Sequence, residues 1–369
     1  MRTIRRLIHG EVLATVTAVT LGFLALFFFF DLVDELAAIR SKSANGYEIL
    51  DALAYLALMV PSHLYELLPI TVLIGTVIVM ARLAQSSEYT ILRTSGLGPW
   101  RALGTLLSLG LGFVLLTFAL GDYVAPYTDR NAQLLKARFQ GRITIGQTGA
   151  WLKEQQQFSN YKINVGALAA DGALREIRIF EFDNQGFLVS TSQAARGRVS
   201  ADDEAWLLEQ VDRTEFAARG AATIRIERSR VDKLRWPTQI TAEMVSATLL
   251  KPERMSTIDL FEYIQHLDAN GQTAQRYEIE FWKKVFYPLS CLVMVVLALP
   301  FAYLHFRSAP IATYVFGGVM AGISFFLLNN VFGYIGNLEN WQPWLTAALP
   351  GIIYSVLSLA AFGWLVLRR

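Results

Sequence analysis

The chain has 369 residues, of which 53% are hydrophobic and 17% are charged, whereas soluble domains average about 25% charged residues. Its formal net charge of +2 gives no reason to expect a nucleic-acid partner, and its single cysteine, Cys291, can form no internal disulfide. Charged residues are concentrated in the middle third, which leaves long apolar stretches at both ends. This distribution predicts a membrane protein with a water-exposed insert.

Six apolar runs approach the roughly 20 residues that a membrane-spanning helix needs. The first is longer than the apolar core of a signal peptide, about 7–15 residues, so we interpret it as a retained helix. The second is predicted to be interrupted and kinked at Pro61 and Pro69, because proline removes a backbone donor and clashes with the preceding turn. The runs cover residues 12–33, 53–83, 103–124, 285–306, 311–335 and 344–367.

The placement of Lys and Arg predicts the orientation of the spans. Nine of these residues fall on the side of the N-terminus, and two fall in the short loops on the opposite side. We therefore expect both termini in the cytoplasm, with the segment between the third and fourth spans outside it. The nine residues are Arg2, Arg5, Arg6, Arg82, Arg93, Arg101, Arg307, Arg368 and Arg369, and the two are Arg40 and Lys42.

The segment between the third and fourth spans has the pattern of short β-strands. Residues 177–179 and 224–226 alternate apolar and polar side chains, as half-buried strands do, and residues 183–186 supply turn residues. Five or more such runs favour a sandwich or jelly roll. A capping-box pattern at 256–259 and the Asn-Gly pair at 270–271 predict a short helix that leads into the fourth span.

The predicted fold class is therefore an α-helical polytopic membrane protein with six transmembrane helices and an inserted periplasmic β-jellyroll domain. We expect transmembrane helices 1–3 in residues 1–125, the β-jellyroll-like domain in 126–276, and transmembrane helices 4–6 in 277–369.

Sequence signatures of enzymes are missing from the chain. It has no G-x-x-x-x-G-K-[ST] phosphate loop, no H-E-x-x-H and no G-x-S-x-G. Its four histidines are scattered over different segments, so we expect neither a metal site nor a cofactor, and no catalytic residue is assigned.

Several ionisable residues fall at membrane depth, where such residues are functional candidates by default. In the predicted topology they all lie in the outer half of the bilayer. The alternative is that each side chain reaches water at the interface. The residues are Asp31, His63, Glu66, Asp122, Lys283 and Lys284.

A G-x-x-x-G pattern at 318–322 in the fifth span allows close helix packing. Packing inside this chain and packing against another subunit both remain open.

The loop between the second and third spans contains a short helix-compatible stretch, residues 88–94, followed by Gly96 as a stop signal. Such an amphipathic helix either lies on the membrane or inserts into the groove of a soluble partner. A chain that combines this feature with no ATP site looks like the membrane half of a transporter.

With these motifs in view, the chain resembles the LptF/LptG permease family of the lipopolysaccharide exporter over nearly its whole length. The stretch GAWLK at 149–153 is similar to the opening of the inserted domain in the LptG branch. The other motifs that carry the resemblance are LVDEL at 32–36, LAQSSE at 83–88, TSG at 94–96, YVAP at 123–126, FYPLS at 286–290 and RSAP at 307–310.

The resemblance implies a non-catalytic permease subunit that extracts lipopolysaccharide from the outer leaflet of the bacterial inner membrane. It implies pairing with an LptF-like permease, ATP hydrolysis by an LptB-like ATPase dimer, and delivery to LptC and a periplasmic bridge. In the family, Glu88 belongs to the helix that faces the ATPase, and Tyr89 and Arg93 lie on the same helix here.

The resemblance also implies basic residues that meet lipid A phosphates at the outer end of the first span. This chain departs from that pattern, because Asp31 stands where a Lys is familiar, and residues 37–38 are Ala where two Lys are familiar. Arg40 and Lys42 are the nearest replacements, and Lys283 and Lys284 open the fourth span at the same level. Asp31 is predicted to pair with a nearby cation and orient it.

Two other functions remain open at this point. One is a membrane-embedded enzyme that uses Asp31, Glu66 or Asp122 as acid or base. The other is a mechanotransmission or signalling protein of the same layout.

Overall fold

A computed structural model of the chain describes residues 2–42, 47–86, 88–94, 96, 98–140, 143–144, 150–156, 159–169, 173–200, 205–217, 225–241, 244–245, 252–302 and 311–364. The chain forms two compact units. The helical unit comprises Met1–Asp34, Met59–Thr128 and Glu278–Arg369, and the sheet unit comprises Glu35–Leu58 and Asp129–Tyr277. The 307–310 motif, residue 149 and residue 224 lie outside the described residues.

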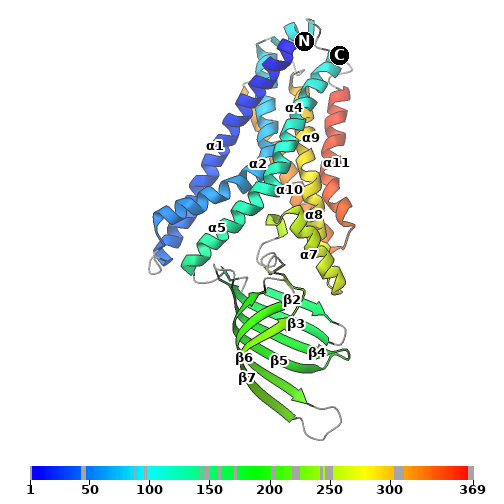
Figure 1. The fold of residues 1–369 in the computed structure, drawn as a ribbon. Helices are drawn as coiled ribbons and strands as arrows, with labels where there is room; N and C mark the ends of the chain where they lie inside the picture. Colours follow the sequence, from blue (N-terminus) through cyan, green and yellow to red (C-terminus); the bar gives the residue numbers. More distant parts are fainter. Residues whose placement is uncertain are drawn as a thin grey trace. The chain divides into compact units, whose positions relative to one another are not determined.

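Among the described residues, six helical stretches are long and apolar enough to cross a membrane, which confirms the six predicted spans. They are Thr3–Ala37, Ile49–Gln85, Pro99–Lys136, Gln275–Ala302, Ala312–Leu338 and Pro343–Phe362. The helices that form them are α1 (Arg2–Lys42), α2 (Ile49–Gln85), α4 (Pro99–Ala119), α5 (Ala125–Gln140), α8 (Gln275–Phe286), α9 (Ser290–Ala298), α10 (Ile311–Leu338) and α11 (Pro343–Phe362), as Figure 1 shows.

The second span differs from the prediction of an interrupted helix. Both Pro61 and Pro69 lie inside the single α-helix α2, which runs without a break for 37 residues. Each proline removes one backbone hydrogen bond, yet the helix continues past both, and α2 contains the most buried apolar window of the six spans.

The third span continues well past its apolar part. After α4 come one π-helical turn, η2 (Leu120–Val124), and then the polar helix α5, with no break in the helical backbone. The predicted boundary between residues 125 and 126 therefore falls inside a continuous helix. Hydropathy shows where a chain leaves the apolar layer, and a helix can continue beyond that point.

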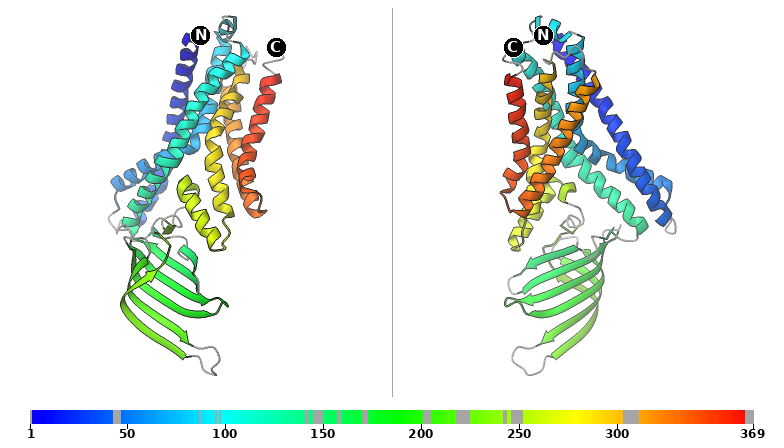
Figure 2. Two further views of the ribbon diagram at one scale, coloured as in Figure 1. Left: turned by 45° about the vertical axis from the view of Figure 1, so that its right-hand side comes forward. Right: turned by 180° about the vertical axis from the view of Figure 1, so that it is seen from behind.

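The fourth span begins ten residues before the predicted start, is interrupted by one 3-10 turn, and has a second 3-10 turn at the end of its described part. The 3-10 turns η4 (Tyr287–Leu289) and η5 (Leu299–Ala302) contain Pro288 and Pro300, whose missing amide hydrogens explain why α-helical bonding lapses there. The fifth and sixth spans, α10 and α11, lie side by side in both views of Figure 2.

The apolar core of the helical unit surrounds α2. One face of α2, including Val72 and Met80, packs with buried residues of α1, α4 and α9. Another face, including Leu73 and Val77, packs with buried residues of α9, α10 and α11. Pro69 is buried beside Leu68 of the first cluster, whereas Pro61 is only partly buried.

The G-x-x-x-G pattern of α10 packs within this chain. A Cβ atom built on Gly322 would lie 2.8 Å from Ile70 Cγ2 of α2, and one on Gly318 would lie 3.7 Å from Val77. Contact this close requires glycine at residue 322. Of the two alternatives that the sequence left open, packing inside one chain is the observed one.

The sheet unit contains one antiparallel sheet of seven strands, which confirms the strand-rich insert. Neighbouring strands pair in the order β1-β3-β4-β5-β6-β7, and β2 pairs with β3. The strands are β1 (Ile143–Thr144), β2 (Ala150–Gln155), β3 (Ser159–Leu168), β4 (Leu174–Asp183), β5 (Leu188–Val199), β6 (Ala205–Ala217) and β7 (Arg225–Pro237). Figure 1 shows that the sheet is strongly curved.

One row of residues, which we name the crease row, crosses the sheet where the pairing is irregular. It consists of Gly166, Glu176, Ala195, Gln210 and Asp232, which lie opposite one another by extension of the flanking register. Glu176 and Gln210 have φ values of 54° and 53°, in the left-handed region that L-residues rarely adopt. The row thus breaks regular pairing at the same level in adjacent strands.

Buried positions shift their spacing at the crease row. In β4 the buried side chains are Leu174 and Ile177, and in β6 they are Leu208 and Val211, so the interval is three residues instead of two. In β4, β5 and β6 one extra residue occupies the crease row, and the same face of the sheet stays apolar on both sides of it.

Helix α7 (Thr257–Ala269) of the sheet unit has the predicted signals at both ends. Ser256 Oγ accepts from the Asp259 amide at 3.1 Å, and the Asp259 carboxylate accepts from the Ser256 amide, which forms a capping box. Asn270 follows the last residue, and Gly271 has a φ of 59°. The Asn270 side-chain oxygen also accepts from the Gln155 amide of β2 at 2.7 Å, so the stop signal fastens α7 to the sheet.

Candidate functional site

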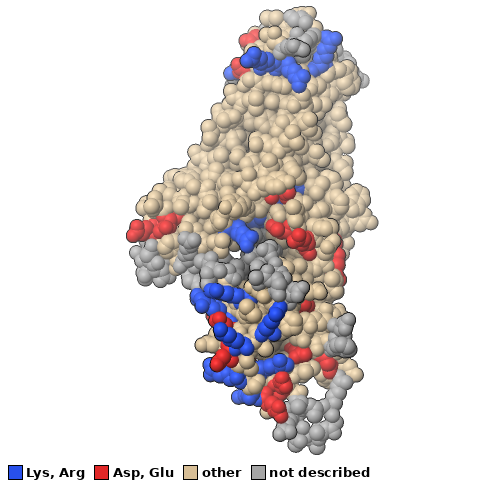
Figure 3. Space-filling model, viewed as in Figure 1, with Lys and Arg blue, Asp and Glu red and all other residues tan. Residues whose placement is uncertain are grey.

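The polar groups of the helical unit occur at two levels. At the end where α1 begins, His9 Nε2 lies 3.0 Å from the carbonyl oxygen of Thr105, and Arg82 pairs with Glu11. These contacts place the ends of α1, α2 and α4 together. Figure 3 shows Lys and Arg gathered at this end, followed by a wide surface band without charged residues.

The short helix predicted between the second and third spans is present at this same end of the unit. It is α3 (Glu88–Thr94), with Glu88 exposed in its first turn and Gly96 at a φ of 100° two residues after its end. The side chains of Tyr89 and Arg93 lie outside the described residues. This short helix between two spans has exposed side chains, among them Glu88, that are available for contact with the membrane surface or with another protein.

At the second level, Asp31 of α1 has a partner within the chain. Its Oδ2 atom lies 2.7 Å from Nε2 of His63 in α2, and the ring of Phe27 lies 5.5 Å from the imidazole ring. The prediction left His63 as an interfacial residue and sought the partner of Asp31 among the basic residues. The side chains of two of those, Arg40 and Lys42, lie outside the described residues.

Glu35, one helical turn beyond Asp31, forms a junction that the sequence reasoning missed. Its carboxylate accepts from Tyr47 Oη at 2.9 Å and from Lys136 Nζ of α5 at 2.8 Å, and it is only 5% exposed. Lys136 also lies 4.3 Å from the ring centroid of Tyr55 in α2. Burial, followed by the hydrogen bond to Glu35, raises the pKa of Tyr47 above its usual value near 10.

A signal for this junction was present in the sequence. Glu35 belongs to the LVDEL motif, which served only as evidence of resemblance. A carboxylate at the end of an apolar run needs a cation within reach when it is buried.

The two lysines that open the fourth span are both engaged. Lys283 Nζ lies 2.6 Å from Glu280 Oε1, and its side chain covers Gly333 of α10. Lys284 is buried, and its ammonium donates to the carbonyl oxygen of Gly121 in the π-turn η2 at 2.9 Å. The two neighbours therefore differ in environment, and the Lys284 ammonium is already bound.

Two aromatic rings shape the surroundings of Lys284. Its ammonium lies 5.9 Å from the ring centroid of Tyr65, which in turn lies 5.0 Å from the ring of Tyr287. Tyr287 Oη donates to the carbonyl oxygen of Glu66 at 2.7 Å. This cluster joins α2, the π-turn and the start of the fourth span.

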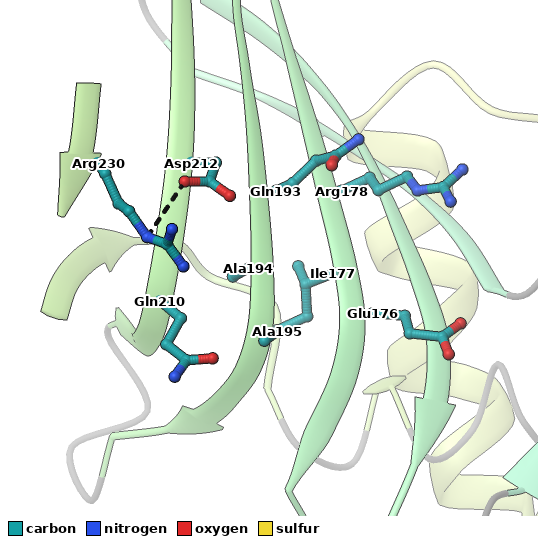
Figure 4. A pocket seen from close by; sticks show the side chains of 9 residues that line it. All are labelled: Glu176, Ile177, Arg178, Gln193, Ala194, Ala195, Gln210, Asp212 and Arg230. Carbon is teal, nitrogen blue, oxygen red and sulfur yellow. Dashed lines mark ion pairs between the residues drawn. The ribbon is translucent and has the colours of Figure 1, made fainter. Parts of the chain in front are cut away.

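The sheet unit has a shallow hollow of about 270 Å³ beside the crease row, shown in Figure 4. Its polar lining includes Glu176, Arg178, Gln210, Asp212 and Arg230, and Arg230 Nε lies 3.6 Å from Asp212 Oδ1. The two carboxylates and two guanidinium groups balance in charge, so the lining selects neither an anion nor a cation. Among the described residues of the whole chain, no group of three or more His, Cys, Asp or Glu is placed to hold a metal ion.

Six apolar spans, a seven-stranded antiparallel insert and polar contacts between the spans define a polytopic membrane protein with an extramembrane β unit. The chain belongs to the lipopolysaccharide export system permease LptF/LptG family, which it matches over residues 6–367. It is 29% identical to the lipopolysaccharide export system permease protein LptG of Escherichia coli over 339 residues, 91% of this chain and 90% of that protein. It is 26% identical to LptG of Haemophilus influenzae over 371 residues, 100% of this chain and 99% of that protein.

Proposed function

We propose that this chain is the permease subunit of an ABC-type exporter that extracts lipopolysaccharide from the outer leaflet of the bacterial inner membrane. The observation that carries the proposal is the family match over residues 6–367, which takes in all six spans and the β unit. The two LptG relatives, matched over at least 90% of their length, support the LptG branch.

The chain works with partners in this proposal. An LptF-like permease forms the other half of the lipid cavity, an LptB-like ATPase dimer hydrolyses ATP, and LptC with a periplasmic bridge receives the lipid. The missing phosphate loop supports ATP hydrolysis by a partner. Both termini are cytoplasmic and the sheet unit is periplasmic, an orientation supported by the nine-to-two distribution of Lys and Arg.

Two groups of residues carry the proposed roles. Glu88, Tyr89 and Arg93 of α3 face the ATPase, and exposed Glu88 supplies a charge for that contact. Arg40, Lys42, Lys283 and Lys284 were the candidates for lipid A phosphates. Of these, Arg40 and Lys42 stay in that role, because Lys283 pairs with Glu280 and Lys284 with a carbonyl.

The test is ATP-driven release of lipopolysaccharide from proteoliposomes that contain the chain with its permease and ATPase partners. Glu88→Lys is expected to detach or uncouple the ATPase, since disrupting a buried charged contact costs ~2–5 kcal/mol. ATPase co-purification and lipopolysaccharide release are measured in parallel.

Glu339→Lys is the matched control, because Glu339 is also exposed and follows α10 in the same unit. Normal ATPase binding and normal release in Glu88→Lys would refute the coupling role. Absence of ATP-dependent release by the unaltered complex would refute the proposed function itself.

A further inference from the structure

We propose that Lys284 is a positioning residue that replaces the hydrogen-bond donor missing from Pro126, and that it thereby fastens the third and fourth spans together at the π-turn. Pro126 ends the YVAP stretch at 123–126, which overlaps the π-turn η2, and Lys284 lies in the first part of the fourth span.

The backbone of the π-turn leaves one carbonyl without its helical donor. The amide of Ala125 donates to the carbonyl oxygen of Leu120, five residues earlier, instead of to Gly121 as in an α-helix. The next amide in line is that of Pro126, which carries no hydrogen. The carbonyl oxygen of Gly121 therefore receives a hydrogen bond from neither Ala125 nor Pro126.

Lys284 supplies the missing donor. Its ammonium lies 2.9 Å from the carbonyl oxygen of Gly121, and the residue is only 8% exposed. A buried ammonium is costly unless hydrogen bonds satisfy it, and a buried carbonyl without a donor is costly as well. Each group relieves the other, which accounts for a lysine at this depth.

The surroundings allow little room for another arrangement. A Cβ atom on Gly121 would lie 2.3 Å from Cε2 of Tyr65, so the ring of Tyr65 packs directly on the π-turn. The ring of Tyr65 also contacts that of Tyr287, three residues after Lys284 in the fourth span, at an interplanar angle of 50°. The bond between Lys284 and Gly121 is thus held between rings from the second and fourth spans.

The position of this bond in the chain gives it a role. The third span leads through α5 into β1, and the chain returns from the sheet unit through α7 and α8 into the fourth span. Lys284 and Gly121 lie on these two connections, so their bond fixes the connections to each other. Movement of one of these spans during transport therefore moves the other span with it.

The test compares Lys284→Met in two backgrounds, the unaltered chain and Pro126→Ala, with each chain assembled in its full complex in nanodiscs. In the unaltered chain, Lys284→Met should lower lipopolysaccharide released per ATP hydrolysed roughly tenfold, the scale of one lost buried hydrogen bond. Pro126→Ala supplies a backbone N–H, so the same change should cost less than threefold there. Lys284→Arg, which keeps a cationic donor, should restore most of the activity.

Arg276→Met is the control, because Arg276 lies in the same helix and its side chain is 57% exposed. It should leave both the thermal midpoint and the ratio of export to hydrolysis unchanged. Equal losses from Lys284→Met in the two backgrounds would overturn the proposal, and so would a Lys284→Met chain that behaves like Arg276→Met.

The export readout rests on the proposed function, while the thermal midpoint does not. If Lys284→Met fails to fold, recovery of folding by the added Pro126→Ala supports the proposal, and no recovery contradicts it. If the unaltered complex exports no lipopolysaccharide, the proposed function fails. The role of Lys284 is then decided by whether Lys284→Met lowers the thermal midpoint less in the Pro126→Ala background than in the unaltered chain.

Discussion

Two regions of α1, one helical turn apart, each contain a carboxylate, and the two carboxylates differ in exposure and in number of partners. Asp31 keeps 35% of its side chain exposed and pairs with His63. Glu35 keeps 7% of its side chain exposed and accepts hydrogen bonds from both Tyr47 and Lys136. The difference shows that burial and the number of bonds rise together, because a desolvated charge needs more partners than a half-solvated one. Glu35 therefore serves mainly the architecture, and Asp31 retains freedom to change partners.

The largest effect is expected when the buried member of this comparison is removed. Glu35→Ala leaves Lys136 without its carboxylate and Tyr47 without its acceptor, and breaking a buried pair costs ~3–5 kcal/mol. The thermal midpoint of the purified chain should fall sharply, and α5 should lose protection against hydrogen exchange. Glu35→Gln keeps an acceptor for Tyr47, so its thermal midpoint should lie between those of the unaltered chain and Glu35→Ala. A midpoint for Glu35→Ala within a degree of the unaltered chain would show that the junction is dispensable.

A smaller effect is expected at Asp31, because it has a single described partner, His63, and its side chain is only partly buried within the chain. Asp31→Ala should cost about 1 kcal/mol of stability or less, the usual scale of a half-exposed pair. Under the orienting role it should nonetheless reduce lipopolysaccharide export, and Asp31→Asn, which still accepts a hydrogen bond, should reduce it less. Full export by Asp31→Ala would mean that this carboxylate is merely solvated at the interface.

The smallest effect is expected at His266 in α7, a third ionisable side chain, because burial favours its neutral form. Burial lowers the pKa of His266 in α7, while the nearby charge of Glu154 acts in the opposite direction. Below the unfolded pKa of about 6.5, the unfolded chain binds a proton that the folded chain resists. Stability should therefore be constant above that pH and decline as the pH falls through it.

The measurement is the thermal midpoint of the chain between pH 7.5 and 5.5. His266→Gln keeps a hydrogen-bonding side chain without the titration, so its midpoint should decline less over this range. Parallel declines in the two chains would assign the pH dependence to other groups.

Features that depend on local sequence were predictable. The six spans, the bounds of the short helix Glu88–Thr94 and both ends of α7 follow from apolar runs and capping patterns. The strand pattern at Ile177 and Ile179 also matches the structure, where both side chains are buried. Five strand-like runs predict an inserted β unit but not the order in which its strands pair.

Contacts between spans could not be predicted, because they depend on how each helix is rotated about its axis. No local pattern joins Asp31 to His63, or Glu35 to Lys136, across intervals of 32 and 101 residues. Pro126 is the exception, since a proline four or five residues after a carbonyl always removes a possible helical donor. That missing donor, combined with a lysine at membrane depth, was a usable signal for the bond between Lys284 and Gly121.

The crease row has a consequence for how this sheet tolerates changes in chain length. Because β4, β5 and β6 each carry one additional residue at the same level, deleting only one of them would leave that strand one residue short of its neighbours. Loss of Glu176 alone, for example, would set Leu174 and Ile177 two residues apart while Leu208 and Val211 of β6 stay three apart. Leu174 and Ile177 would still face the same side, but either β5 would keep an unpaired residue opposite β4, or β4 would slip by one residue against both neighbours. A single-residue deletion in one strand at this level should therefore destabilise the sheet. Matching deletions in all the strands are geometrically acceptable.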